Sequence, residues 1–392
     1  FAVRGTLPWS NFLNSPTSWE PVDYRSFIDQ LLRSGSNMVM FHSYDYEPYG
    51  GYFSDGRLQV GAPHRTTGDE VWGTKVTKTD EFVCGTDKMF SGEYFGAGSS
   101  FGDGDSGAKV KRQQEILRKA LDYGKKRGVR SCLGIDTPGD PMDEVVRERF
   151  IERVNFLLDF YPQVDFFGLW RQEWFGPAGY PNRNLKLSAE SYLHDYVPMF
   201  KSKYSRIVEL ILGVNYPGSW AKFVGGEKGK YLRATEAVRF EQFAMLAYRQ
   251  LVKRESSPEL VLSGWGGEEY MLASDYFEGL NEDMPREVVF SALDEISTRG
   301  DLDKIYSDLP EWRSRWPIPW FENDGDLWMP QPHVGDYAKI MDKARRSGSD
   351  GILSIHWRTR EIGMNYGFML GYSWDPSLTV DRFFEEFAER EF

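Results

Sequence analysis

Short apolar runs alternate with amphipathic helical patterns along the 392-residue chain, and this alternation predicts an α/β fold with a mainly parallel sheet. Eight such runs stand out, and eight parallel strands close a TIM barrel. The connections that enter these runs are short, whereas those that leave them are long. The sequence therefore predicts a (β/α)8 TIM barrel with long loops at the C-terminal ends of its strands.

The strand-like runs are rich in Val, Ile, Leu and Phe, as expected for strands buried on both faces. They cover residues 37–41, 129–135, 164–170, 209–214, 259–263, 288–293, 318–321 and 351–355. A ninth run at residues 3–9 competes for the eight places. Either it is the first barrel strand and another run is peripheral, or it lies outside the barrel.

Helices are expected between the runs because apolar residues recur at helical spacing. One stripe comprises Phe27, Ile28, Leu31 and Leu32, and another lies within residues 116–121. A glycine that follows basic residues marks three expected helix ends, which favours left-handed C-caps. These glycines are Gly35, Gly128 and Gly348.

The long connections are dense in Gly, Pro, Asp, Tyr and Trp, and the longest is an insertion at about residues 45–108. A loop of this length is uncommon unless it is functional or folds on itself, so we expect an active-site wall with a small hairpin. No charge break, repeat or linker divides the sequence. Residues 1–392 are therefore expected to form a single elaborated barrel.

The composition excludes several partners. A formal net charge of -12 argues against nucleic acid, and no apolar stretch approaches the roughly 20 residues of a membrane span. Cys84 and Cys132 are too few and too far apart to indicate a disulfide scaffold or a structural zinc site. Because Phe1 is not an initiator methionine, we expect an exported protein, periplasmic or secreted, whose signal sequence is absent from this chain.

Carboxylates and aromatic residues follow the predicted strands, where barrel enzymes carry their reactive groups. Two carboxylates that flank a cleft hydrolyse a glycosidic bond when one protonates the departing oxygen and the other attacks or activates water. Glu173 is the predicted general acid, because neighbouring Trp170 and Trp174 would desolvate it and raise its pKa. Glu322 is the predicted nucleophile or base, and Asp324 is the alternative.

Aromatic faces stack on sugar rings, and many aromatic residues lie at the predicted strand ends. The expected sugar-binding rim comprises Trp9, Tyr44, Tyr46, Trp170, Trp174, Tyr216, Trp265, Trp320, Trp328 and Trp357. Further substrate-binding candidates are His42, Arg171, Asn215, Glu268, His356 and Arg358. The histidines would hydrogen-bond hydroxyl groups, whereas the arginines would brace catalytic carboxylates or bind an anionic substituent.

Structural roles compete with these assignments. Glu268 would equally stabilise the start of the helix that follows, because negative charge complements the helix dipole there. Asp136 and Asp294 are two further carboxylates that follow predicted strands. Asp136 would equally hold an Asx-type turn, and Asp294 would equally begin a helix. For both His42 and His356, the alternative is a histidine that makes its hydrogen bonds within the protein and does not touch the substrate.

Several of these residues form a pattern that resembles a known family. Arg4-Gly5, Phe41-His42, residues 134–139 (GIDTPG) and the strand-end Glu173 occur in the order found in the barrel of β-hexosaminidases. In those enzymes an Asp precedes the acid Glu and assists attack by the acetamido group of the substrate. Gln172 stands at this position here, so substrate-assisted chemistry is not expected.

A second, looser resemblance involves residues 171–177 (RQEWFGP), which are similar to the α-glucuronidase stretch in which the acid Glu precedes a Gly-Pro turn. This similarity implies that Glu173 is the acid. Together the two resemblances imply a distant relative of exo-acting glycosidases that cleaves a poly- or oligosaccharide without a cofactor. Release of an acidic sugar, as by α-glucuronidases, is an alternative.

Two further alternatives remain open. One is a metal-dependent sugar-processing barrel in which His42, Asp136, Glu173 and His356 would ligate a cation, although no characteristic metal-binding spacing supports a metal site. The other is a non-catalytic carbohydrate-binding barrel, for which the aromatic residues would suffice.

Overall fold

The computed structural model describes most of the chain, and the structural statements below concern these residues. They are residues 1–9, 16–45, 47–60, 70–71, 74–75, 106–137, 139–171, 227–255, 257–264, 274–323, 331–357 and 362–391.

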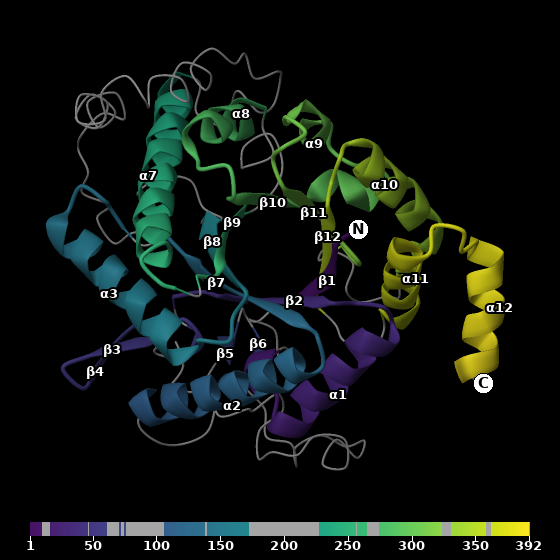
Figure 1. The fold of residues 1–392 in the computed structure, drawn as a ribbon, viewed down its shortest axis with the longest axis horizontal. Coiled ribbons are helices and arrows are strands. Elements are labelled where there is room, and N and C mark those ends of the chain that lie inside the picture. Colours follow the sequence, from purple (N-terminus) through teal and green to yellow (C-terminus); the bar gives the residue numbers. More distant parts are fainter. Residues whose placement is uncertain are drawn as a thin grey trace.

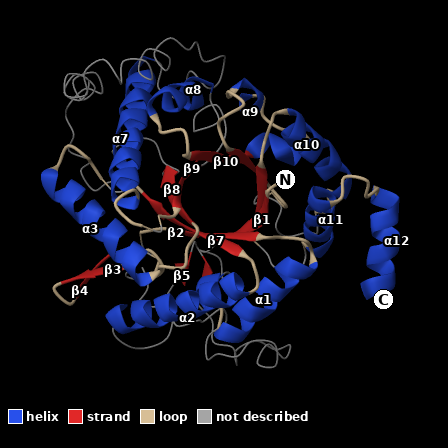
Figure 2. Ribbon diagram, viewed as in Figure 1, coloured by secondary structure: helices blue, strands red, loops and turns tan. Residues whose placement is uncertain are grey.

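Eight parallel strands form a closed barrel, which confirms the predicted (β/α)8 architecture (Figures 1 and 2). They are β1 (Val3–Pro8), β2 (Met38–Ser43), β7 (Arg130–Asp136), β8 (Phe166–Arg171), β9 (Glu259–Gly264), β10 (Val289–Asp294), β11 (Arg315–Pro319) and β12 (Gly351–His356). Neighbours follow the order β11-β10-β9-β8-β7-β2-β1-β12. A parallel bridge between Trp320 and Ile355 joins the two ends of this order.

The run at residues 3–9 is the first barrel strand, because β1 pairs in parallel with both β12 and β2. The expectation of a barrel strand at residues 209–214 was wrong, since β8 pairs directly with β9 from Phe166 opposite Glu259 to Arg171 opposite Gly264. That run itself lies outside the described residues. A short apolar run does not by itself distinguish a barrel strand from another buried segment, so only the pairing resolves the choice.

Helices surround the barrel, and the outermost is α12 beside α11 (Figure 1). They are α1 (Pro21–Arg33), α2 (Ser106–Lys126), α3 (Glu144–Phe160), α7 (Glu227–Leu251), α8 (Ser274–Asp283), α9 (Ile305–Asp308), α10 (Val334–Arg346), α11 (Gly363–Trp374) and α12 (Val380–Glu391), with short 3-10 turns at η1 (Pro16–Ser18) and η5 (Glu295–Arg299). In the part of the chain that the structure describes, none of the helices has the length and apolar character needed to cross a membrane.

The helix signals of the sequence are confirmed. Phe27, Ile28 and Leu31 are buried in the core, and Leu32 packs against it. Asp143 caps α3 by accepting hydrogen bonds from the backbone N–H groups of Val145 and Val146. The three predicted C-terminal glycines have positive φ angles of 85°, 81° and 76°, the left-handed conformation that favours glycine. These glycines are Gly35, Gly128 and Gly348.

The insertion after β2 contains two short antiparallel hairpins. One pairs β3 (Tyr52–Ser54) with β4 (Arg57–Val60), and the other pairs β5 (Glu70–Val71) with β6 (Thr74–Lys75). The first hairpin packs against α3, on the outside of the barrel. The hairpin expected in this insertion is therefore present.

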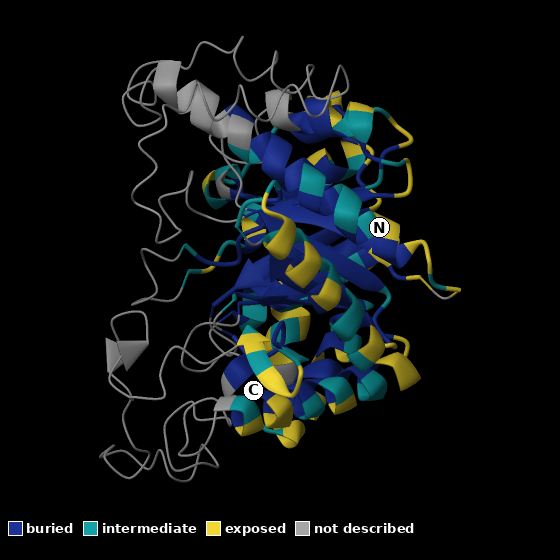
Figure 3. Cartoon of the chain, turned by 90° about the vertical axis from the view of Figure 1, so that its left-hand side faces the viewer, coloured by how far each residue is buried: buried dark blue, intermediate teal, exposed yellow. Residues whose placement is uncertain are grey.

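Two apolar clusters lie on the two sides of the barrel wall. Alternate residues of each strand point inward, where Met38, Met40, Phe166 and Leu353 form part of the inner cluster. The intervening residues point outward and pack under the helices. Figure 3 shows the buried strands at the centre and the exposed residues on the outer helices.

Two buried arginines hold together the end of the barrel where the strands begin. Arg313 donates hydrogen bonds to the backbone carbonyls of Met284 at 3.0 Å, and of Pro285 and Val288 at 2.7 Å. Burial lowers its pKa to about 10. Arg315, two residues further on, donates in the same way to carbonyls around α9 and α10. Each guanidinium thus satisfies several buried carbonyls that water would otherwise have to reach.

Asp294, at the end of β10, caps the 3-10 turn η5, so its alternative interpretation as a helix start is confirmed. Its carboxylate accepts hydrogen bonds from the backbone N–H groups of Ile296 at 3.0 Å and Asp303 at 2.9 Å. Burial nevertheless raises the pKa of Asp294 to about 7, above its ordinary value of 3.8.

We predict that Arg313→Met lowers the free energy of unfolding by about 3 kcal/mol, because several buried carbonyls lose their donor. Urea denaturation followed by circular dichroism measures this change. The control is Arg382→Met on the exposed face of α12, where the pair with Glu386 at 2.7 Å is expected to contribute no more than about 0.5 kcal/mol. Equal effects of the two substitutions would contradict the role of Arg313.

A second prediction concerns pH. Because the pKa of Asp294 is raised in the folded state, the folded protein retains a proton that the unfolded chain releases between about pH 4 and about pH 7. This group therefore lowers the free energy of unfolding as pH rises through that range, and Asp294→Asn is expected to remove the decrease. Urea denaturation of both proteins across the range measures it, with the exposed Asp381→Asn as control. A pH-independent difference between the unmodified protein and Asp294→Asn would contradict the prediction.

Candidate active site

The inner wall of the barrel is aromatic where the strands end. Five residues of the rim expected from the sequence belong to the inner apolar cluster, and all five are buried. They are Trp9, Tyr44, Trp170, Trp320 and Trp357. They come from or directly follow β1, β2, β8, β11 and β12, so they gather from around the barrel at the end where barrel enzymes carry out chemistry.

His42 and Asp136 form a close pair among these rings. The Nε2 atom of His42, on β2, lies 3.2 Å from Oδ1 of Asp136, at the end of β7. The imidazole stacks on Trp9 with ring centroids 5.1 Å apart, and Trp170 lies at 4.7 Å on a tilted plane. Burial raises the pKa of Asp136, whereas the neighbouring His42 acts in the opposite direction. The pair is thus a polar group inside an aromatic enclosure.

Glycine makes room for this arrangement. Gly134 of β7 lies opposite His42 of β2, and a Cβ atom there would lie only 3.4 Å from Nδ1 of the imidazole. A Cβ atom on Gly168 of β8 would lie 2.9 Å from the Cα atom of Gly134. A side chain at Gly168 would force β7 and β8 apart, whereas one at Gly134 would press tightly against the imidazole.

Glu322 lies two residues beyond Trp320 and is 1% exposed. Its Oε1 atom accepts a hydrogen bond of 3.0 Å from the backbone N–H of Trp357, which follows β12. The rings of Trp320 and Trp357 meet edge to face at 5.1 Å. The predicted second carboxylate is therefore held in one orientation beside two indoles.

The segment after β2 is tied to helix α3. Arg153 of α3 pairs with Asp45 at 2.6 Å and donates a hydrogen bond of 2.8 Å to the carbonyl of Gly50. Glu47 accepts a hydrogen bond of 2.9 Å from the backbone N–H of Tyr44. These contacts fix the backbone that carries Tyr44 into the inner cluster.

Two predicted binding residues lie on the other side of the barrel wall. His356 is buried among outward-facing residues, with its ring 6.1 Å from those of Phe27 and Phe321. Arg171 lines a small cavity together with Arg239 and Phe243 of α7, on the outer side of β8. The structure therefore does not bring His356 or Arg171 together with the inner aromatic residues.

The alternation of inward-facing and outward-facing side chains along each strand also argues against the metal-dependent alternative. His42 faces inward and His356 faces outward, so these two proposed ligands do not converge. Within the described ranges, no three His, Cys, Asp or Glu side chains gather in a way that could hold a metal ion.

The remaining predicted site residues lie outside the described residues. They are Glu173, Trp174, Asn215, Tyr216, Trp265, Glu268, Asp324 and Arg358, together with Tyr46 and Trp328 of the expected rim.

The sequence interpretation gave Asp136 a role only as a turn residue or as a ligand in the metal-dependent alternative, and it did not pair Asp136 with His42. The structure places Oδ1 of Asp136 3.2 Å from the imidazole of His42. The available signal was the spacing: Cys132, Gly134 and Asp136 alternate along β7 and therefore share the inner face.

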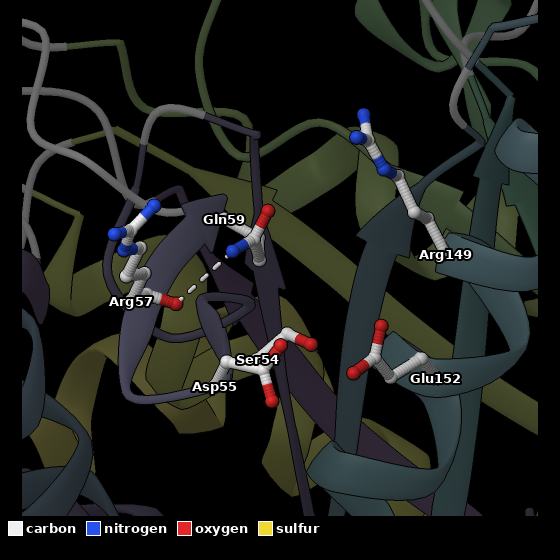
Figure 4. Close-up of a pocket in the computed structure, with 6 residues that line it drawn as sticks. All are labelled: Ser54, Asp55, Arg57, Gln59, Arg149 and Glu152. Atoms are coloured by element: carbon white, nitrogen blue, oxygen red, sulfur yellow. Dashed lines mark hydrogen bonds between the residues drawn. The ribbon is translucent and has the colours of Figure 1, made fainter.

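A pocket of about 490 Å³ lies outside the barrel, between the first hairpin and α3 (Figure 4). Its lining residues are Ser54, Asp55, Arg57, Gln59, Arg149 and Glu152. The described lining residues are charged and polar, and none of them offers an aromatic ring on which a sugar would stack, so the pocket is a weaker candidate than the inner wall.

No protein-family model matches the sequence, and no curated protein matches it either. Solved structures match its fold. An O-GlcNAc hydrolase mutant from Thermobaculum terrenum gives a TM-score of 0.50 at 10% identity, over 99% of this chain and 63% of that one. The catalytic domain of a β-amylase from Paenibacillus polymyxa gives 0.48 at 9%, over 95% and 96%. A sugar phosphate isomerase/epimerase from Parabacteroides distasonis gives 0.41 at 7%, over 95% and 96%.

These similarities concern the fold, because all three identities are low. The chain spans less than two thirds of the length of the O-GlcNAc hydrolase, of which it covers 63%. The similarity to the O-GlcNAc hydrolase supports the predicted barrel architecture and, at 10% identity, shows the fold alone.

Proposed function

We propose that the protein is a glycoside hydrolase that acts on the ends of poly- or oligosaccharides. Glu173 is the proposed general acid and Glu322 the nucleophile or base, with Asp324 as the alternative for the second role. The observation that supports this most is the position of Glu322, oriented by the backbone of Trp357 beside two indole rings. Exo action rests on the resemblance to β-hexosaminidases and α-glucuronidases.

The aromatic inner wall suits a sugar ring. A pyranose presents C–H groups on its faces and hydroxyl groups at its edge, so an indole can cover the face while polar groups bind the edge. Trp320 and Trp357 supply such surfaces next to Glu322. A ring bound there would place its anomeric carbon within reach of a carboxylate.

The proposed acid follows a different strand. Glu173 comes two residues after β8 ends at Arg171, whereas Glu322 comes three residues after β11 ends at Pro319. Two strands, β9 and β10, separate β8 from β11 in the barrel. Carboxylates supplied from these two strand ends would approach a bound glycosidic bond from different sides, as the reaction requires.

The reaction then takes one of two courses. In a retaining enzyme Glu322 bonds to the anomeric carbon while Glu173 protonates the departing oxygen, and water activated by Glu173 later releases the sugar. In an inverting enzyme Glu322 removes a proton from a water that attacks directly. Carboxyl groups about 5 Å apart favour the first course, and groups about 6.5 to 9.5 Å apart favour the second. The anomer formed initially, observed by proton NMR, distinguishes them.

We predict that Glu173→Gln lowers kcat/KM about 10² to 10⁴-fold on a natural oligosaccharide, because the leaving oxygen loses its acid. The loss is expected to be smaller on a 2,4-dinitrophenyl glycoside, whose leaving group needs no proton. Glu322→Gln is expected to impair both substrates alike. Initial rates on a panel of oligosaccharides and aryl glycosides measure these effects.

The matched control is Glu386→Gln on the exposed face of α12, which is expected to leave the rates unchanged. If Asp324→Asn abolishes turnover and Glu322→Gln does not, the second role belongs to Asp324. Full activity of Glu173→Gln on the oligosaccharide would exclude Glu173 as the acid. Sugar binding without any product would favour the non-catalytic barrel, and a stoichiometric transition metal in the purified protein would favour the metal-dependent one.

A further inference from the structure

Four buried polar side chains lie on four consecutive barrel strands at the end that carries the aromatic rings. They are His42 on β2, Asp136 on β7, Trp170 on β8 and Ser263 on β9. Asp136 pairs with Trp170 in the strand register, and Trp170 pairs with Ser263, so these three occupy one level of the wall. His42 contacts both Asp136 and Trp170.

In the described part of the chain, five buried polar atoms of these side chains have no hydrogen-bond partner of good geometry. The unpaired atoms are both imidazole nitrogens of His42, Oδ1 of Asp136, Nε1 of Trp170 and Oγ of Ser263. Three of the side chains are completely buried, and Asp136 is 4% exposed. Nε2 of His42 lies 3.2 Å from Oδ1 of Asp136, but this contact lacks the geometry of a directed hydrogen bond. Burying unpaired polar groups is costly, so their retention here needs a reason.

Other parts of the inner wall do not show this pattern. Deeper in the barrel the wall is apolar at Met38, Met40 and Val261. Ser291, a buried serine on β10, donates a hydrogen bond of 2.7 Å to the carbonyl of Trp316. Trp316 also has an unpaired indole nitrogen, but its ring packs deeper, against Phe166 and over Gly351. A row of unpaired groups on neighbouring strands thus coincides with the proposed active-site end.

We infer that His42, Asp136, Trp170 and Ser263 form a subsite that binds the hydroxyl groups of one sugar ring. Trp170 donates, Asp136 accepts, and Ser263 and His42 can do either. Neighbouring strands lie about 4.8 Å apart, a spacing comparable with the width of a pyranose ring. Trp9 and Tyr44, which contact His42, provide the adjoining apolar surface. The sugar as ligand class rests on the proposed function, whereas the unpaired groups do not depend on it.

The test measures sugar binding by three variants and two matched controls. Ser263→Ala, Trp170→Phe and Asp136→Asn each remove one group of the subsite, whereas Ser291→Ala and Trp316→Phe make the same changes elsewhere on the inner wall. Calorimetric titration uses glucose, galactose, N-acetylglucosamine and glucuronic acid separately. For the best-bound sugar, Kd is expected to rise about 5- to 10-fold in Ser263→Ala and Trp170→Phe, and about 10- to 100-fold in Asp136→Asn. Both controls are expected to retain the Kd of the unmodified protein.

Thermal unfolding provides a second readout that needs no ligand. Ser291→Ala is expected to lower Tm because it removes a hydrogen bond, whereas Ser263→Ala is expected to leave Tm unchanged or raise it. If Asp136→Asn does not fold, Ser263→Ala and Trp170→Phe still carry the test.

The outcomes separate this subsite from the proposed function. Unchanged binding in all three variants, combined with loss of turnover in Glu322→Gln, would overturn the subsite and leave the hydrolase intact. Weakened binding with no turnover of any glycoside would support the subsite and overturn the hydrolase. If none of the four sugars binds, or if a crystal structure with bound sugar shows these four groups bonded to internal water only, the subsite is excluded.

Discussion

The side-chain alternation of parallel strands across a closed wall is the constraint on which this structure depends. Because the barrel has no free edge, every strand must place one residue inside and the next beneath a helix. Trp170 and Arg171 illustrate the consequence, since adjacent residues lie in different environments. The inner row becomes apolar where it must pack and polar or aromatic where the strands end. The polar and aromatic groups of the candidate site therefore gather at one end of the inner surface.

The two ends of the barrel differ in how their buried polar groups are paired. Where the strands begin, Arg313 and Arg315 satisfy backbone carbonyls from several connections, so this end is held by buried hydrogen bonds. Where the strands finish, the polar groups of His42 and Asp136 are enclosed by indoles without satisfying one another fully. The unpaired polar groups on four neighbouring strands at the second end are the basis for the subsite that we infer there.

The proposed chemistry follows from this division. Glu322 accepts a hydrogen bond from the backbone N–H of Trp357, which gives its carboxylate a defined direction next to Trp320 and Trp357. The position of Tyr44 is also fixed, because Arg153 pairs with Asp45 and donates a hydrogen bond to the carbonyl of Gly50 in the segment that follows Tyr44. Gly134 and Gly168 allow the strands and His42 to approach closely. In the proposed function, this preorganised inner surface would hold a sugar ring while a carboxylate acts on its glycosidic bond.

The sequence by itself determined the barrel, the apolar stripes of the helices, the glycines at helix C-termini and the aromatic character of the strand ends. These features depend on periodicity and on local backbone preference, which involve only residues close together in the sequence. The sequence also predicted, from their positions at strand ends, that Glu322 and His42 belong to the site, and both assignments stay predictions. Only the tertiary structure decided that residues 3–9 form the first strand and that His356 and Arg171 face outward, since pairing and side-chain direction depend on partners distant in sequence. The same holds for Asp136, whose contact with His42 exists only because β2 and β7 are neighbours.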